Sequence, residues 1–263
     1  MGSATTQALA ATTAALDAAS GVDLDVAREL FAAARAVGDS SQLSGALADS
    51  SAPVAARRKV VADVFGTSLT PTSASLLTTA VEQRWSSAGD LVDGIEELAM
   101  RAAAIADDSG DVEDELFRFS RTVAGSSELE LALGSRLGGA SAKGDLVRTL
   151  LGGRASAAAT LIASSLVQQP RERRVRQLLS RATRIVADQR GRKVATVFAA
   201  SPLSAAQVDR LAAALSARYG ARVSINTVVD PAVVGGLRVQ IGDDVIDASV
   251  SSRLADLRQR LAG

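Results

Sequence analysis

Residues 30–47 read LFAAARAVGDSSQLSGAL, and residues 116–133 read LFRFSRTVAGSSELELAL. The two segments are identical at nine of their 18 positions, and each identical pair is 86 residues apart. The same spacing relates later residues, such as Val81 and Val167. Because an internal repeat of this length defines the architecture of a chain, we predict a duplicated unit of about 86 residues.

Each copy has the periodicity of amphipathic helices. Apolar residues recur every three or four positions over 26–37, and another helix is expected from Pro53 to Gly66. The first copy ends in an apolar stripe over 91–105, and the second ends in an equivalent stripe over 178–186. The spacing between these last stripes is 87 residues, so the repeat slips by one residue. We therefore predict that both copies contain several helices in the same order.

Beyond residue 190 the periodicity changes from helical to alternating, which is typical of strands. Ser204 has the position of a helix N-cap, and a last helix is expected to begin at Ser249. One expected strand has four side chains on one face: Val223, Ile225, Thr227 and Val229. The predicted fold class is α+β and predominantly α, with tandem helical bundle copies at 1–109 and 110–190 and a small α+β domain at 191–263.

The composition excludes several kinds of active site. The 263 residues include no Cys and no His, which rules out disulfides, thiolate nucleophiles, imidazole bases and His or Cys metal ligands. Hydrophobic residues make up 47% of the chain and aromatic residues only 3%, which favours closely packed helices with small side chains. Any chemistry would depend on carboxylates, Lys, Ser, Thr or backbone amides.

The N-terminal residues give no targeting signal. Residues 1–20 contain no basic residue, so they do not resemble a secretory signal, and no apolar stretch is long enough to span a membrane. Residues 1–6 fit the loose N-myristoylation pattern, but this pattern is short and is matched often by accident. We expect an ordinary flexible start and no direct membrane insertion.

The net charge of zero conceals two oppositely charged segments. Residues 90–115 hold ten acidic residues and one basic residue, whereas residues 171–193 hold nine basic and two acidic residues. The basic segment has no aromatic residues on which nucleic-acid bases could stack, so we interpret it as a protein-binding or solvated face. Neighbouring residues such as Glu96 and Glu97 point to different faces of a helix. We therefore interpret the acidic run as a solvated face rather than a metal or acid–base site.

The segment 230–250 reads DPAVVGGLRVQIGDDVIDASV, and its features are explained by the needs of the fold. An Asp-Pro turn, a Gly-Gly pair with permissive backbone dihedrals, a Gly-Asp hairpin turn and a Ser helix start all occur in this segment. None of these features needs a ligand.

The same segment, preceded by VFAASPLS at 197–204, resembles the C-terminal signature of the δ subunit family of F-type ATP synthases, the bacterial counterparts of the oligomycin-sensitivity conferring protein. The motifs Ala-x-Pro-Leu-Ser, Val-Asp-Pro-x-x-x-Gly-Gly and Gly-Asp-x-x-x-Asp-x-Ser-Val follow in the family's order. The signature residues are Pro202, Leu203, Asp230, Pro231, Gly235, Gly236, Gly242, Asp243, Asp247, Ser249 and Val250. The duplication departs from the family, which has one six-helix N-terminal bundle, and resembles the enlarged actinobacterial members.

The resemblance implies a structural stator subunit with no catalytic, cofactor-binding or metal-binding residues. Such a subunit joins the top of the catalytic α/β head to the peripheral stalk, so that rotation is coupled to ATP synthesis. Its helical domain holds N-terminal segments of α subunits, and its C-terminal domain joins the b subunit. The implied location is the cytoplasmic face of the bacterial cell membrane, as a peripheral part of the complex.

The duplication leaves two hypotheses open. In the first, residues 111–190 hold the α segments and the first copy braces the b stalk, because the last helices of the copies are opposite in charge. In the second, the segments 90–115 and 171–193 pair with each other within the chain.

Two other functional classes remain as alternatives. The chain could be a helical-repeat adaptor unrelated to ATP synthase, or a nucleotide-binding enzyme that uses Gly235 and Gly236. A phosphate loop at 138–144 is not expected, because this glycine-containing stretch lacks the Gly-Lys-Ser/Thr ending. We interpret that stretch as a loop between helices.

Overall fold

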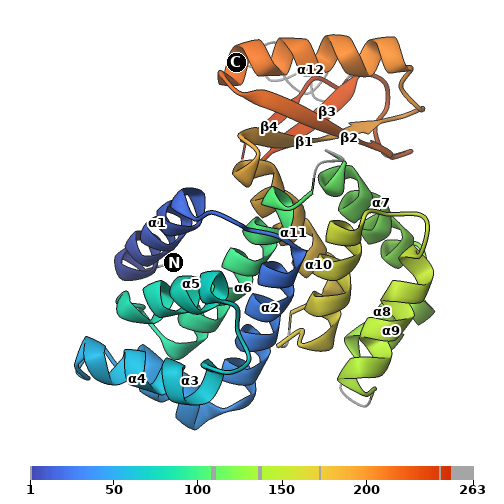
Figure 1. The fold of residues 1–263 in the computed structure, drawn as a ribbon. Helices are drawn as coiled ribbons and strands as arrows, with labels where there is room; N and C mark the ends of the chain where they lie inside the picture. Colours follow the sequence, from blue (N-terminus) through green and yellow to red (C-terminus); the bar gives the residue numbers. More distant parts are fainter. Residues whose placement is uncertain (1, 108–110, 136–137, 172, 243, 250–263) are drawn as a thin grey trace, which may run out of the picture. The chain divides into compact units, whose positions relative to one another are not determined.

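The computed structural model describes residues 2–107, 111–135, 138–171, 173–242 and 244–249 (Figure 1). The chain divides into two compact units, Met1–Val186 and Ala187–Gly263. In the described residues, helices form the first unit, and the second contains a small sheet and the helix α12 (Ala205–Tyr219). The predicted fold class, α+β and predominantly α, is confirmed.

Eleven helices precede the sheet in the described part of the chain. They are α1 (Ser3–Ala18), α2 (Leu24–Asp39), α3 (Ser41–Ala48), α4 (Val54–Phe65), α5 (Pro71–Glu82), α6 (Ala88–Ile105), α7 (Val112–Ala124), α8 (Ser127–Gly134), α9 (Ala140–Leu151), α10 (Ala157–Gln168) and α11 (Val175–Gln189). The starts of α3, α4 and α5 are each 86 residues before those of α8, α9 and α10, and α6 starts 87 residues before α11. The repeated helix order and its one-residue slip are thus present in the structure.

A repeated carboxylate contact fixes the same helix end in both copies. The Glu29 side chain accepts hydrogen bonds from the backbone N–H of Thr70 at 2.8 Å and from its hydroxyl at 2.9 Å. Glu115 accepts the equivalent bonds from Ser156, at 2.9 Å and 2.6 Å. Each bond to the backbone satisfies an N–H group at the start of a helix, where the helix itself supplies no acceptor. The contact ties α2 to α5 in the first copy and α7 to α10 in the second.

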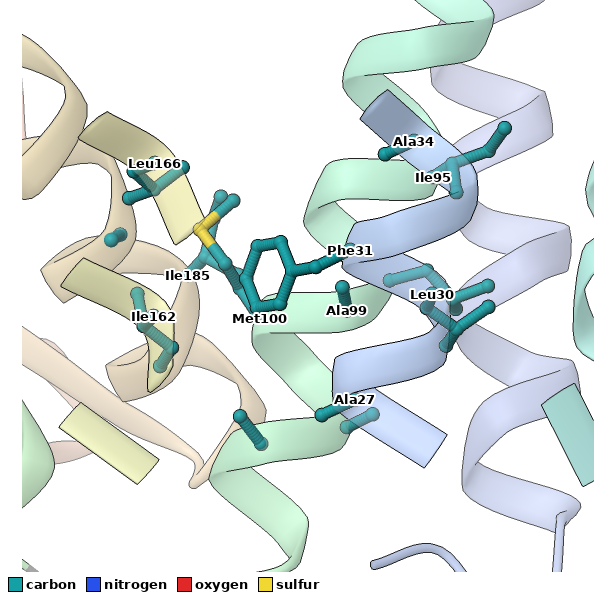
Figure 2. Packing of buried hydrophobic residues seen from close by; sticks show 14 of the residues in the cluster. Ala27, Leu30, Phe31, Ala34, Ile95, Ala99, Met100, Ile162, Leu166 and Ile185 are labelled. Atoms are coloured by element: carbon teal, nitrogen blue, oxygen red, sulfur yellow. The ribbon is translucent and has the colours of Figure 1, made fainter. Parts of the chain in front are cut away.

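Helix α6 is buried on all sides. Between Leu91 and Ala104 every residue except Asp93 is buried. Figure 2 shows α6 packed between α2 and the helices of the second copy: Phe31 and Met100 meet near Leu166 and Ile185. Apolar residues from both copies therefore form one continuous core, and the division of the helical part into two domains stays a prediction.

The first residues form a helix, so the expectation of a flexible start is wrong. Helix α1 buries Thr5, Ala8, Thr12 and Leu16. The Thr5 hydroxyl donates to the Asp90 carboxylate at 3.0 Å, and the Thr12 hydroxyl donates to the Ala8 carbonyl at 3.0 Å. Because two of the buried positions are threonines with satisfied hydroxyls, the apolar stripe of this helix is weak in the sequence.

The oppositely charged segments meet inside the first unit, as the second hypothesis predicts. Arg173 makes two hydrogen bonds to the Glu96 carboxylate, at 2.9 Å and 3.1 Å, and Arg181 Nη2 lies 3.3 Å from Glu97 Oε2. Arg171 pairs with Asp93. These three arginines and three acids, with Arg101, form what we name the α6 charge cluster.

The prediction of a solvated acidic face is wrong for Glu96 and Glu97, which are only 6% and 7% exposed. Their burial is possible because each carboxylate has an arginine partner, and Glu97 also accepts a 2.9 Å hydrogen bond from Arg101 on its own helix. An unpaired carboxylate in this position would lose its hydration without compensation.

The second unit is a four-stranded sheet with the order β2-β1-β3-β4. Its elements are β1 (Arg192–Ala199), α12 (Ala205–Tyr219), β2 (Arg222–Val229), β3 (Leu237–Ile241) and β4 (Asp244–Asp247). Strands β1 and β2 are parallel and are connected through α12, whereas β3 is antiparallel to β1 and β4. Ser204 and Gln207 form a capping box at the start of α12, and Gly220 ends the helix with a φ of 63°.

The four side chains predicted to share one face of β2 differ in burial along the strand. Val223 and Ile225 pack in the core of this unit, but Thr227 and Val229 are exposed, and Asn226 and Val228 are buried instead. The pairing with β1 continues without a break, so the register is not the cause. Each face of the strand is buried over part of its length, and an alternating pattern cannot identify a single buried face in that case.

Removal of one arginine from the α6 charge cluster tests its contribution to stability. We expect Arg173→Ala to lower the free energy of unfolding by about 2 kcal/mol, because buried Glu96 loses its bidentate partner. Arg174→Ala, which changes an exposed neighbour outside the cluster, is the control and should have almost no effect. The double variant Arg173→Ala/Glu96→Gln should recover most of the loss. Urea unfolding measures all four proteins, and equal stability of Arg173→Ala and the unchanged chain would contradict the prediction.

The contact of Glu29 with α5 makes stability depend on pH. Burial acts to raise the pKa of Glu29, but hydrogen bonds from Ser73 and Thr70 outweigh it and hold the pKa below its usual range. The stability that the ionised carboxylate contributes is therefore present above the unfolded pKa of about 4.3 and is lost as the pH falls through the lower folded pKa.

We expect Glu29→Gln to be less stable than the unchanged chain at pH 7, by about 1 kcal/mol, since a charged acceptor is lost. The difference should shrink as the pH falls below about 4. Exposed Glu128→Gln is the control. Unfolding curves recorded between pH 3 and pH 7 measure the effect, and a difference that stays constant over this range would rule out the proposed linkage.

Candidate interaction surfaces

The signature residues between Pro202 and Gly236 lie around the end of the sheet at which β1 and β2 end and β3 begins. Pro202 and Leu203 follow the end of β1 and lead into α12; Pro202 is exposed, and Leu203 packs against the core of the unit. Asp230 follows the end of β2, and its N–H donates to the carbonyl of Ala199, the last residue of β1, at 2.9 Å. This bond holds the ends of the two parallel strands together.

The Asp230-Pro231 pair forms a tight turn after β2. The Asp230 side chain accepts a hydrogen bond from the N–H of Ala232 at 2.9 Å, and its carbonyl accepts one from Val233 at 3.0 Å. The proline fixes its own φ and needs no backbone donor in this turn. The turn directs the chain away from β2 toward β3.

Gly235 and Gly236 bring the chain into β3 with φ angles of 68° and 77°. A Cβ atom on Gly236 would overlap with the carbonyl oxygen of Ala248, so glycine is required there for both space and backbone conformation. Gly236 thus approaches the chain's own backbone, and this contact explains the glycine without a bound nucleotide. Gly242, with a φ of 58°, lies in the hairpin between β3 and β4, and Asp243 lies outside the described residues.

The last described residues are fixed by Asp247. Its carboxylate accepts a 2.9 Å hydrogen bond from the N–H of Ser249. Bonds from the Ser249 hydroxyl and N–H, together with the positive charge of Arg238, lower the pKa of Asp247 and favour its ionised form. Ser249 is buried, whereas Val250 and the helix expected after it lie outside the described residues.

A groove of about 550 Å³ lies between α12 and the chain that enters β3. Leu203, Gly235 and Gly236 of the signature line it together with side chains of α12, including Gln207 and Arg210. Among the described residues that line it, Arg210 is the only charged one. These residues suit the side chains of a partner segment and include no pair of groups for acid–base chemistry.

A second groove, of about 610 Å³, lies in the helical unit between α8 and the start of α11. Its lining includes Leu131, which is 73% exposed, and the side chains of Arg174 and Arg176. Leu131 was not predicted from the sequence as a surface residue of interest, although the repeat carries a signal for it. The residue 86 positions earlier is Gly45, so the second copy has an exposed leucine where the first has a glycine.

The glycine-containing stretch at 138–144 is only in part a loop. Gly138 and Gly139 lie before α9, but Ala140–Gly144 already belong to that helix. Lys143 is buried and donates to the carbonyl of Ser135, so it serves the fold rather than a phosphate.

Two further properties concern the described residues alone. They contain no group of three or more acidic side chains arranged to hold a metal ion. None of their helices combines the length and apolar character needed to cross a membrane.

Relatives of the chain match it over its full length. ATP synthase subunit delta of Leifsonia xyli subsp. xyli is 49% identical over 265 residues, covering 100% of both chains. The same subunit of Streptomyces griseus subsp. griseus is 41% identical over 271 residues, again covering 100% of both chains. A chain of the Toxoplasma gondii mitochondrial ATP synthase hexamer aligns with a TM-score of 0.40 and 28% identity, over 64% of this chain and 96% of that chain.

The family model for the ATP synthase delta (OSCP) subunit matches residues 97–261. This match begins inside α6 and includes the second helical copy and the signature of the second unit. It excludes an adaptor unrelated to ATP synthase. The chain belongs to the ATP synthase delta (OSCP) subunit family.

Proposed function

We propose that the chain is a non-catalytic stator linker, which joins the catalytic α/β head of ATP synthase to the b subunit of the peripheral stalk. Family membership is the observation that carries this proposal. The grooves on α8 and α11 and on α12 support it, because their lining combines small, apolar and polar or charged residues that suit segments of partner proteins. A linker of this kind acts at the cytoplasmic face of the cell membrane without entering it.

We further propose that the helical unit holds N-terminal segments of α subunits and that the second unit joins b. The family match begins at residue 97, so the second copy with α6 and the second unit correspond to a family member of ordinary length. The preceding residues form an additional bundle that shares its core with the second copy. Because the opposite charges of the copies pair with each other, they give no reason to assign the first copy to b.

Site-specific cross-linking in the assembled enzyme tests this assignment. A photoreactive residue replaces exposed Gln7 on α1 in one variant and exposed Gln207 on α12 in another. We expect the first to link to α and the second to link to b, each detected by mass spectrometry after affinity purification. A link from the Gln7 position to b together with a link from the Gln207 position to α would overturn the assignment of the units.

The same preparation tests the function itself. The tagged chain should co-purify with α, β and b subunits in a stoichiometric complex. A complex without any ATP synthase subunit would overturn the proposed function. As a control, the tag is placed on an unrelated protein of similar size and expressed in the same cells.

A further inference from the structure

The repeat relates one face of α6 to one face of α11. On α6, Gly89, Asp93 and Glu97 lie at i, i+4 and i+8 and therefore share one face. The residues 87 positions later are Arg176, Ser180 and Arg184, at the same spacing on α11. One face is acidic and the other basic, although they are equivalent positions in the two copies.

The acidic face of α6 is covered by the chain itself. Asp93 pairs with Arg171 and lies 3.4 Å from Arg173 and 3.8 Å from Arg181, and Glu97 lies 3.3 Å from Arg181. The covering residues come from the segment before α11 and from α11. An acidic face of the first copy is thus neutralised by a basic segment that belongs to the second.

The equivalent face of α11 is uncovered. Arg174 and Arg184 are exposed, and neither has an acidic partner within the described residues. Arg176 forms a partly exposed pair with Glu130 at 3.0 Å. Arg174, Arg176 and Arg184 line a hollow of about 370 Å³, together with Gln177 and Ser180. Cations placed this close repel one another, so an anionic partner would be favoured.

The groove that contains Leu131 adjoins this hollow, because Arg174 and Arg176 line both. The combined surface, which we name the α11 face, therefore presents an exposed leucine beside three arginines. An exposed apolar side chain within a charged surface is typical of a site where a partner protein covers it.

We infer that the α11 face binds an acidic segment of a partner subunit. In the contact on α6 the helix face is acidic and the covering segment is basic, whereas in this contact the helix face is basic and the partner segment is acidic. The segment would carry carboxylates about 12 Å apart, the separation of Arg176 and Arg184 along a helix, and an apolar side chain against Leu131. This inference rests on the proposed function, since the partner is a subunit of the same complex. Beyond the proposed function, the inference specifies an acidic partner segment and the α11 face as the surface that binds it.

The lining of the α11 face favours a protein partner over a phosphate-rich one. Glu130 lies in the groove beside Leu131 and would repel a phosphate backbone or an anionic headgroup. A peptide segment can place an apolar side chain near Glu130 and its carboxylates near the exposed arginines.

Charge reversal on the α11 face tests the inference. The variant Arg174→Glu/Arg184→Glu changes two exposed side chains, and Arg121→Glu/Arg154→Glu makes the same change in net charge at exposed positions of α7 and of the residues between α9 and α10. Binding to the purified ATP synthase complex from which the chain has been removed is measured at low and high salt. We expect the first variant to bind at least about tenfold more weakly at low salt and to lose much of the salt dependence. The control should bind within about twofold of the unchanged chain.

A photoreactive residue at Leu131 identifies the occupant. The linked peptide should contain at least two Asp or Glu residues within about two to three helical turns. Equal binding by the charge-reversed variant, or links only to segments without acidic residues, would overturn the inference while leaving the proposed function intact. The inference would also be overturned if the charge-reversed variant lost binding to phosphatidylserine vesicles or duplex DNA but bound the ATP synthase complex as well as the unchanged chain does. If the unchanged chain does not bind the complex, both proposals fail.

Discussion

Helix α6 imposes the constraint on which the helical unit depends, because it is buried on all sides and yet carries Glu96, Glu97 and Arg101. A helix in this position needs apolar neighbours around its whole circumference, and the two copies supply them from opposite sides. Its carboxylates need partners as well, which the arginines before and within α11 provide. The last helix of the first copy therefore takes its apolar contacts from both copies and its charge partners from the second.

The duplication preserves contacts that the helices need and changes those that face outward. Glu29 and Glu115 hold equivalent helix starts in the two copies. Elsewhere the copies diverge: exposed Gly45 corresponds to exposed Leu131, and the acidic face of α6, which arginines of the chain cover, corresponds to an exposed basic face on α11. Inner positions are restrained by packing and by buried polar groups, whereas exposed positions can change with little effect on stability.

Much of the architecture can be predicted from sequence, because local signals are strong where they occur. Caps such as Ser204, breakers such as Pro53 and the 86-residue spacing locate most helices. Features that depend on distant residues are not predictable in this way. The burial of Glu96 depends on Arg173, which is 77 residues away in the sequence. The helix α1 has only a weak apolar stripe, because two of its buried positions are threonines whose hydroxyls form hydrogen bonds. The signature glycines could be located from the motif, but the contact of Gly236 with Ala248 required the structure.

Sharing α6 between the copies also has a mechanical consequence. Two bundles joined by a flexible connector would bend at the connector when one is pulled against the other. Here α6 packs against both copies in one close-packed core, and a close-packed interior resists compression. Load applied to one copy would therefore pass to the other through many small contacts at once, rather than through the connecting residues alone.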